Sequence, residues 1–142
     1  MHCFPGLVGG MRPAEPGGMR EENDLVPRVH EFALASIRFV QCLPKTSVAQ
    51  SLGRQYLNSS TSVNSNYNAD KRGRSPAEFI SKLGTVVEEI DESVGWLEVL
   101  RDAGIANDPD LLCEAQQLRR IFGKSLGTAR RNYASRSKKH QP

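Results

Sequence analysis

Apolar residues recur every three or four positions along four stretches of the chain, and this spacing predicts helices with one buried face. The clearest helix starts after Ser75, where a Ser cap, Pro76 and Glu78 form a start signal of three parts. Gly104 is suited to end it. Its predicted core-facing residues are Phe79, Leu83, Val86 or Val87, Ile90, Val94, Leu97 and Leu100.

Two helices are predicted before this one, the first from about Asp24 to Cys42 and the second from about Ser47 to Lys71. Leu43-Pro44 separates them, because the residue before a proline disfavours helical backbone. The apolar positions of the first helix are Leu25, Val29, Phe32, Ile37 and Val40. Those of the second helix are Val48, Leu52, Tyr56, Val63 and Tyr67.

The second helix contains an unusual polar stretch at residues 58–66, which read NSSTSVNSN. Ser, Thr and Asn side chains compete with the helical backbone for hydrogen bonds, so propensity alone favours a loop here. We predict a helix because the apolar positions Tyr56, Val63 and Tyr67 stay in phase through the stretch.

A fourth helix is predicted to start at Asp108-Pro109, and its apolar positions are Leu112, Leu118, Ile121, Phe122, Leu126 and Tyr133. No sustained alternation of apolar and polar residues indicates a strand. The sequence therefore predicts an all-α fold, an antiparallel up-down four-helix bundle over residues 24–135. Residues 1–23, with five Gly and three Pro, are predicted to be a flexible N-terminal extension in which Met19 is the natural start. Residues 136–142 are predicted to be a basic disordered tail.

The charge of the chain is unevenly distributed. Residues 1–118 carry 11 Lys and Arg against 16 Asp and Glu, whereas residues 119–142 carry 8 basic residues and no acid. One interpretation is a solvated helix end whose basic residues suit the negative pole of the helix dipole. The other is a nucleic-acid contact surface formed by Arg119, Arg120, Lys124, Arg130 and Arg131.

Residues that would carry catalysis are not arranged for it. None of His2, His30 and His140 lies three or four residues from another histidine or from a cysteine, so no metal site is expected. The sequence has no phosphate-binding loop. Residues 123–127 read GKSLG, which fits Gly-x-Ser-x-Gly, but they lie within the predicted fourth helix and not on the strand-to-helix turn that a nucleophile elbow requires. We therefore expect no enzyme activity, no cofactor and no small-molecule substrate. Because no apolar run approaches the roughly 20 residues of a membrane span, we expect no membrane partner. The odd number of cysteines and their wide spacing predict no disulfide framework, so we expect a cytoplasmic location.

A polar network inside the bundle is a further hypothesis. Ser59, Ser62 and Asn66 lie three and four residues apart, so they share one face of the second helix with Arg54 farther along it. If this face is partly buried, its groups need partners, and the acids Glu89 and Glu92 of the third helix are candidates. The alternative is a solvated polar face beside the core.

Residues 53–97 resemble a known protein family. The resemblance is carried by Gly53-Arg54-Gln55, by the stretch from Ser59 to Tyr67, by Ser75-Pro76-Ala77-Glu78-Phe79-Ile80-Ser81-Lys82-Leu83, and by Glu89, Glu92 and Trp96-Leu97. These segments are similar to the four-helix-bundle proteins encoded in intervening sequences of bacterial 23S ribosomal RNA genes. The resemblance implies a bundle that assembles into a ring, commonly a homopentamer. A related protein, the accessory variability determinant of diversity-generating retroelements, binds reverse transcriptase and nucleic acid.

Two functional hypotheses follow from these observations. The first is a non-catalytic, homo-oligomeric protein of the structural or interaction type. Trp96 and Val99 support it, since they lie off the main apolar stripe of the third helix and are placed to face another subunit. The alternative for Trp96 is a position in the core. The second is an accessory protein that binds RNA or DNA through the basic surface of the fourth helix.

Overall fold

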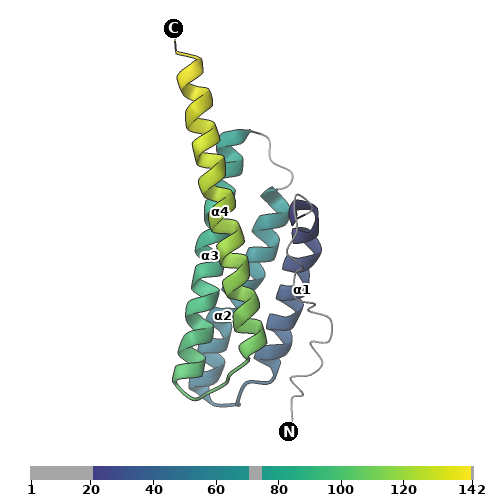
Figure 1. Cartoon of the computed structure of the whole chain (residues 1–142). Coiled ribbons are helices and arrows are strands. Elements are labelled where there is room, and N and C mark those ends of the chain that lie inside the picture. Colours follow the sequence, from purple (N-terminus) through teal and green to yellow (C-terminus); the bar gives the residue numbers. More distant parts are fainter. Residues whose placement is uncertain (1–20, 71–74, 142) are drawn as a thin grey trace.

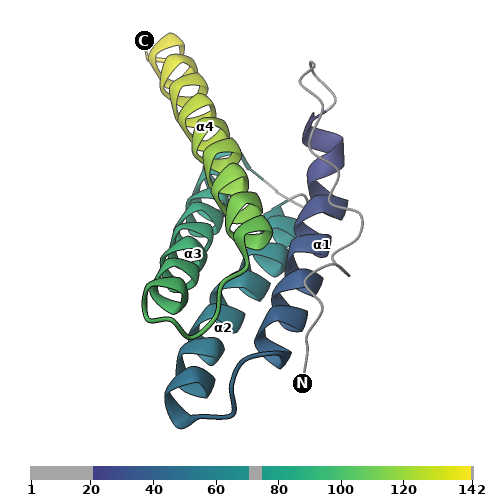
Figure 2. The ribbon, with the colours of Figure 1, turned by 60° about the horizontal axis from the view of Figure 1, so that its bottom comes forward.

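The structure, a computed structural model, describes residues 21–70 and 75–141, and four helices make up almost all of them (Figure 1). The helices are α1 (Glu21–Gln41), α2 (Ser47–Asp70), α3 (Pro76–Asp102) and α4 (Pro109–Lys139). Each helix runs antiparallel to the one before it, and α2 packs between α1 and α3 (Figures 1 and 2). The described residues contain no strand, so the predicted all-α four-helix bundle is confirmed.

The start of α3 has the predicted capping geometry. Ser75 is extended, with φ −143° and ψ 156°, and its hydroxyl accepts a hydrogen bond from the Glu78 backbone N–H at 3.2 Å. Asp108 caps α4 in the same way through the Leu111 N–H at 3.0 Å. At the other end of α3, Gly104 adopts φ +70°, a left-handed conformation that glycine tolerates best. These local signals explain why the start and end of α3 and the start of α4 could be predicted.

The polar stretch at residues 58–66 is helical throughout, as the phase of the apolar residues predicted. Several of its hydroxyl groups donate hydrogen bonds to backbone carbonyls in the preceding turn of the same helix. Ser59 donates to the Tyr56 carbonyl at 3.0 Å, Ser60 to the Leu57 carbonyl at 3.2 Å, and Thr61 to the same carbonyl at 2.7 Å. Because these bonds add to the helical ladder rather than replace it, the stretch keeps its helical form.

Two helix ends differ from the prediction. Helix α1 begins at Glu21, three residues before Asp24, and α4 continues to Lys139. The prediction of a disordered tail from residue 136 is therefore wrong as far as Lys139. Residues 136–139 read RSKK, of which Arg and Lys favour helix, and these cations suit the helix C-terminus. The rest of the predicted N-terminal extension, residues 1–20, lies outside the described residues.

The core runs along the middle of the bundle and contains most of the predicted apolar residues. The largest fully buried side chains are Tyr56, Phe32, Phe122, Leu83, Ile90, Leu100, Leu111 and Leu118. Tyr67 and Phe122 link α2 to α4 across the core, with ring centroids 5.3 Å apart. Aromatic pairs at this separation add to the stabilisation that burial of their apolar area provides.

Four residues that were predicted to face the core are exposed instead: Ile37, Val48, Phe79 and Tyr133. The core positions next to the first two belong to small residues, Ser36 in α1 and Ala49 in α2, both of which are buried. A search for large apolar residues overlooks such positions. Phe79 lies in the first turn of α3 and Tyr133 near the end of α4, where the other described helices leave them 40% and 44% exposed.

Gly53 shows how closely the first two helices approach near their shared turn. A Cβ atom at this position would lie 2.6 Å from the Leu43 side chain and 3.5 Å from that of Val40. Leu43 is 3% exposed, so it fills the space that the glycine leaves. Across residues 21–70 and 75–141, no helix has the length and apolar character needed to cross a membrane.

Candidate functional site

A seam of buried hydroxyl groups joins α2 to both of its neighbours. On the α3 side, the Ser93 hydroxyl lies 3.0 Å from the Ser59 Oγ and 2.8 Å from the Glu89 carbonyl oxygen, and its single proton is shared between these acceptors. Both serines are almost fully buried. Small side chains at this level let α2 and α3 lie close together, and the hydrogen bond fixes their relative height.

On the α1 side, Ser36 and Tyr56 form the matching contact. Their oxygens are 2.6 Å apart, and the Ser36 hydroxyl donates to the Phe32 carbonyl at 2.8 Å, which leaves the Tyr56 phenol to donate to Ser36. The Phe39 ring packs edge-on against the Tyr56 ring at 5.6 Å. Burial raises the pKa of the Tyr56 phenol above its ordinary value, and the hydrogen bond with Ser36 opposes this shift only in part.

The predicted polar network is only partly present. Ser59 is buried and bonded to α3, but its partner is Ser93 rather than an acid. Since Ser59 and Ser93 lie at the same height and the helices are antiparallel, Arg54 lies at the height of Glu98. This is six residues, or about 9 Å along the axis, from Glu92. Among the described residues Arg54 is exposed and forms no ion pair with these acids.

Ser62 and Asn66 are half-buried at the margin of this seam. The Ser62 carbonyl accepts a hydrogen bond from the Ser65 hydroxyl at 3.3 Å, within the same helix. In the described part of the chain, neither side chain has a hydrogen-bonding partner on α3. The position of these two residues therefore agrees better with the alternative that was left open, a solvated polar face beside the core.

Helix α3 carries a row of acids on its outward side. Glu88 and Glu92 are exposed and one helical turn apart, while Glu89 between them is half-buried. Partial desolvation raises the pKa of Glu89, and repulsion from Glu92 and Glu88 raises it further. Glu92 accepts a hydrogen bond from the Trp96 indole N–H at 3.3 Å. The predicted position off the core stripe is confirmed for Val99, which is exposed, whereas Trp96 is half-buried and packs against the core.

Three basic residues of α4, Arg120, Lys124 and Arg131, lie opposite its buried face. Arg119 forms an ion pair with Asp91 of α3 at 3.2 Å, whereas Arg120, Lys124, Arg130 and Arg131 are exposed. The helical spacing of four and seven residues aligns three of them with Lys138 in one row, which we call the basic row: Arg120, Lys124, Arg131 and Lys138. Lys138 was missed because it was assigned to a disordered tail.

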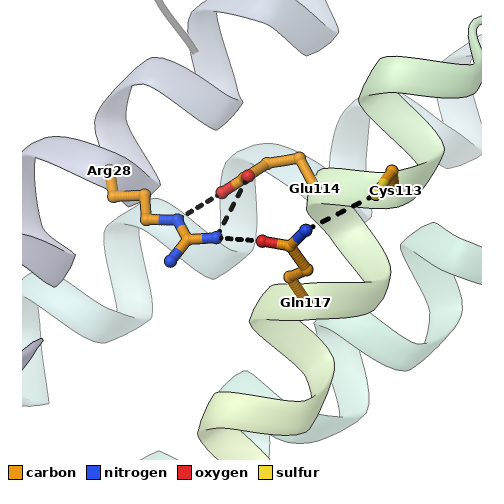
Figure 3. A network of polar contacts seen from close by, with 4 residues as sticks. All are labelled: Arg28, Cys113, Glu114 and Gln117. Atoms are coloured by element: carbon orange, nitrogen blue, oxygen red, sulfur yellow. Dashed lines mark hydrogen bonds and ion pairs between the residues drawn. The ribbon is translucent and has the colours of Figure 1, made fainter. Parts of the chain in front are cut away.

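A second polar contact joins the first and last helices (Figure 3). The Arg28 guanidinium of α1 donates to both oxygens of Glu114 in α4, through Nε and through a terminal nitrogen at 3.1 Å. The same terminal nitrogen donates to the Gln117 Oε1 at 2.9 Å. The Gln117 amide in turn lies 3.5 Å from the exposed Cys113 thiol. This network was not predicted, since single charged residues beside apolar ones give no signal of pairing.

The hydroxyl seam and the two charged rows differ in what they can do chemically. The hydroxyls bond to carbonyl oxygens and to one another, an arrangement that sets helix register but does not activate a nucleophile. Residues 21–70 and 75–141 contain no group of three His, Cys, Asp or Glu residues that could hold a metal ion. The charged rows are exposed and elongated, which suits contact with another macromolecule.

Comparison with known proteins supports the fold. No protein-family model and no curated protein matches the chain. A solved structure that is similar is a protein of unknown function from the S23 ribosomal protein family of Bacteroides thetaiotaomicron. It has a TM-score of 0.68 and 23% sequence identity, and the match covers 75% of this chain and 98% of that one. At this identity the likeness shows a shared four-helix fold.

Proposed function

We propose that this chain is a non-catalytic bacterial protein that acts in the cytoplasm by assembling with copies of itself. The fivefold stoichiometry we propose comes from the resemblance to the family encoded in intervening sequences of 23S ribosomal RNA genes. The observation that carries self-assembly is the set of large apolar side chains that one bundle leaves exposed. Val48 is 60% exposed, Val99 45%, Tyr133 44%, Phe79 40% and Ile37 37%.

Two of these residues lie close in height at one end of the bundle. The ion pair between Arg119 and Asp91 sets the relative height of α4 and α3, and it places Tyr133 two residues, or about 3 Å along the axis, from Phe79. Each retains about two fifths of its surface in contact with solvent. A second copy that covered both rings would remove apolar area from water, which favours association.

The experiment that tests this proposal is a native mass measurement across a concentration series. The expected result is a particle of five times the 15.7 kDa chain mass. A mass of one chain at micromolar concentration would contradict self-assembly, and another multiple would contradict only the fivefold stoichiometry. Phe79→Ser is expected to lower the mass at a given concentration, whereas the control Pro76→Ala, in the same first turn, leaves it unchanged.

A second candidate function is binding of RNA or DNA, and one observation favours it. Figure 1 shows that the C-terminal end of α4 extends beyond the other three helices. The residues from Arg130 onward include Arg131, Arg136, Lys138 and Lys139 and no acid, and all these side chains are exposed. A helical segment this short is marginal without a partner. Phosphate groups would neutralise its charge and occupy its solvent-exposed sides.

Retention of a labelled single-stranded RNA and a DNA duplex, measured as a function of salt, tests the second candidate. Binding is expected at low salt, with an affinity that falls steeply as salt rises because each phosphate contact releases counterions. Arg136→Glu with Lys139→Glu is expected to weaken binding at every sequence. No retention at low salt would contradict this function and would leave self-assembly untouched.

A further inference from the structure

The outward faces of α3 and α4 carry opposite charges within a single chain. On α3 the exposed pair Glu88 and Glu92 is one turn apart, and on α4 the exposed pair Arg120 and Lys124 is also one turn apart. Like charges at this spacing destabilise a helix by a few tenths of a kcal/mol. Glu88, Arg120 and Lys124 form no ion pair among the described residues, so the repulsion within each pair is not relieved inside the chain.

The two pairs lie at the same height along the bundle. Since Arg119 contacts Asp91, and the helices are antiparallel, Arg120 lies level with Ile90, midway between Glu88 and Glu92. By the same reasoning Lys124 is two residues, or about 3 Å, from the height of Glu88. A neighbouring copy related by rotation about an axis parallel to the bundle keeps these heights.

The same faces also carry glycines whose missing side chains nothing in the described structure explains. A Cβ atom on Gly84 or Gly95 of α3, or on Gly123 of α4, would have no atom within 4 Å. Glycine in an exposed helix costs about 1 kcal/mol relative to alanine. Gly84 is one residue in height from Gly127, the glycine one turn beyond Gly123. Two helix backbones could therefore approach closely at that level.

We propose that the outward face of α4 in one copy docks on the outward face of α3 in the next copy, with Arg120 and Lys124 against Glu88 and Glu92. This inference rests on the proposed self-assembly and specifies how it occurs. Because the two faces differ, the contact is head-to-tail, and repetition of it closes into a ring if the rotation between copies allows. Electrostatic complementarity of this kind fixes orientation and suppresses wrong partners.

Charge reversal tests the docking, with native mass as the readout. Glu88→Lys with Glu92→Lys, and separately Arg120→Glu with Lys124→Glu, are each expected to convert the assembly to single chains. The fourfold variant that combines all these substitutions restores opposite charges and is expected to recover the assembly. Glu31→Lys with Asp102→Lys, and Arg38→Glu with Lys45→Glu, change the net charge equally at exposed positions elsewhere. These controls are expected to keep the assembled mass.

The outcomes separate this proposal from the one it rests on. If the unmodified protein assembles and both reversed variants keep its mass, the docking is wrong and self-assembly stands. If the unmodified protein is a single chain, both are wrong. If Arg120→Glu with Lys124→Glu loses RNA retention and keeps the assembled mass, the basic row serves nucleic acid and the docking is wrong. A salt titration of the unmodified protein tests the docking without relying on a variant that folds. The native mass of the assembly is expected to fall as ionic strength rises, and a constant mass contradicts the docking.

Discussion

The Ser93 hydroxyl of α3 lies 3.0 Å from the Ser59 Oγ of α2, in a part of the core where Ser59 is 2% exposed and Ser93 0%. This contact sets the height of α2 against α3. It also explains why a serine-rich segment can be an interior helix, since larger side chains at either position would push the two helices apart.

Replacing Ser59 with Leu is therefore expected to destabilise the fold. Extra methylene groups in a packed interior cost about 1–3 kcal/mol, and the Ser93 hydroxyl loses one of its two acceptors. Ser62→Leu is the matched control, because Ser62 is only half-buried and, in the described part of the chain, has no hydrogen-bonding partner on α3. Urea unfolding measures both variants, and an equal loss of unfolding free energy would contradict the packing described here.

The hydrogen bond between Ser36 and Tyr56 predicts that removing one partner destabilises the fold more than removing the other. Tyr56→Phe leaves Ser36 bonded to the Phe32 carbonyl, so the loss is expected to be about 0.5–1.5 kcal/mol. Ser36→Ala leaves the buried Tyr56 phenol without this acceptor, which costs about 1–3 kcal/mol. Chemical denaturation of the two single variants checks the order, and a larger loss for Tyr56→Phe would contradict it.

The same tyrosine predicts a pH dependence in alkaline solution. Because the folded pKa of Tyr56 is raised above the ordinary value of 10.0, the folded state holds the phenolic proton more firmly than the unfolded state does. Its contribution to stability is complete below pH 10 and is lost as the pH rises further. Unfolding free energies measured on both sides of pH 10 are expected to fall more steeply for the natural chain than for Tyr56→Phe. Parallel curves would contradict the shift.

The Arg28 contact with Glu114 is expected to be stronger than the exposed ion pair between Arg119 and Asp91. The Arg28 and Glu114 side chains are 24% and 11% exposed, and the contact uses both carboxylate oxygens. A double-mutant cycle with alanine is expected to give a coupling energy of about 1.5–3 kcal/mol. The same cycle on Arg119 and Asp91 should give about 0–1 kcal/mol. Equal coupling energies would show that burial does not strengthen the first pair.

Local sequence signals were sufficient for the starts of α3 and α4 and for most of the core. Ser75 and Asp108 each cap a helix through a side chain three residues from the N–H it accepts, a relationship that the sequence displays directly. The buried position of Ser36 was not found, because it is defined by the Tyr56 phenol on another helix. The spacing of apolar residues indicates which face of a helix is buried. It does not indicate which residue of a neighbouring helix contacts that face.

The candidate site shows the same limit. The helical periodicity correctly predicted that Ser59 lies on the face of α2 that contacts α3. It could not show that the hydrogen-bonding partner is Ser93 and not Glu89 or Glu92. That choice depends on the relative height of α2 and α3 along the bundle axis, and a shift of one helical turn is about 5.4 Å. The Arg28 contact with Glu114 joins residues 86 positions apart in the chain, so no local pattern indicates it.

Glu89 offers a final test of the acidic face of α3. Its pKa is raised, first by desolvation and then by repulsion from Glu92 and Glu88, so the ionised form is less favourable in the folded chain than in the unfolded one. Stability linked to this group is complete below the ordinary value of 4.5 and is lost as the pH rises past it. Glu89→Gln, which is neutral, is therefore expected to melt at a higher temperature than the natural chain at pH 7.

Calorimetry at pH 7 and at pH 4 measures this difference, which is expected to shrink at the lower pH because Glu89 is then mostly protonated in both states. Glu31→Gln on α1 is the control, since Glu31 is exposed and away from the acidic face. If Glu89→Gln lowers the melting temperature at pH 7, the Glu89 carboxylate is stabilised by a partner. A neighbouring copy that brings Arg120 against this face would supply such a partner, so the measurement is best made at a concentration where the chain is a single bundle.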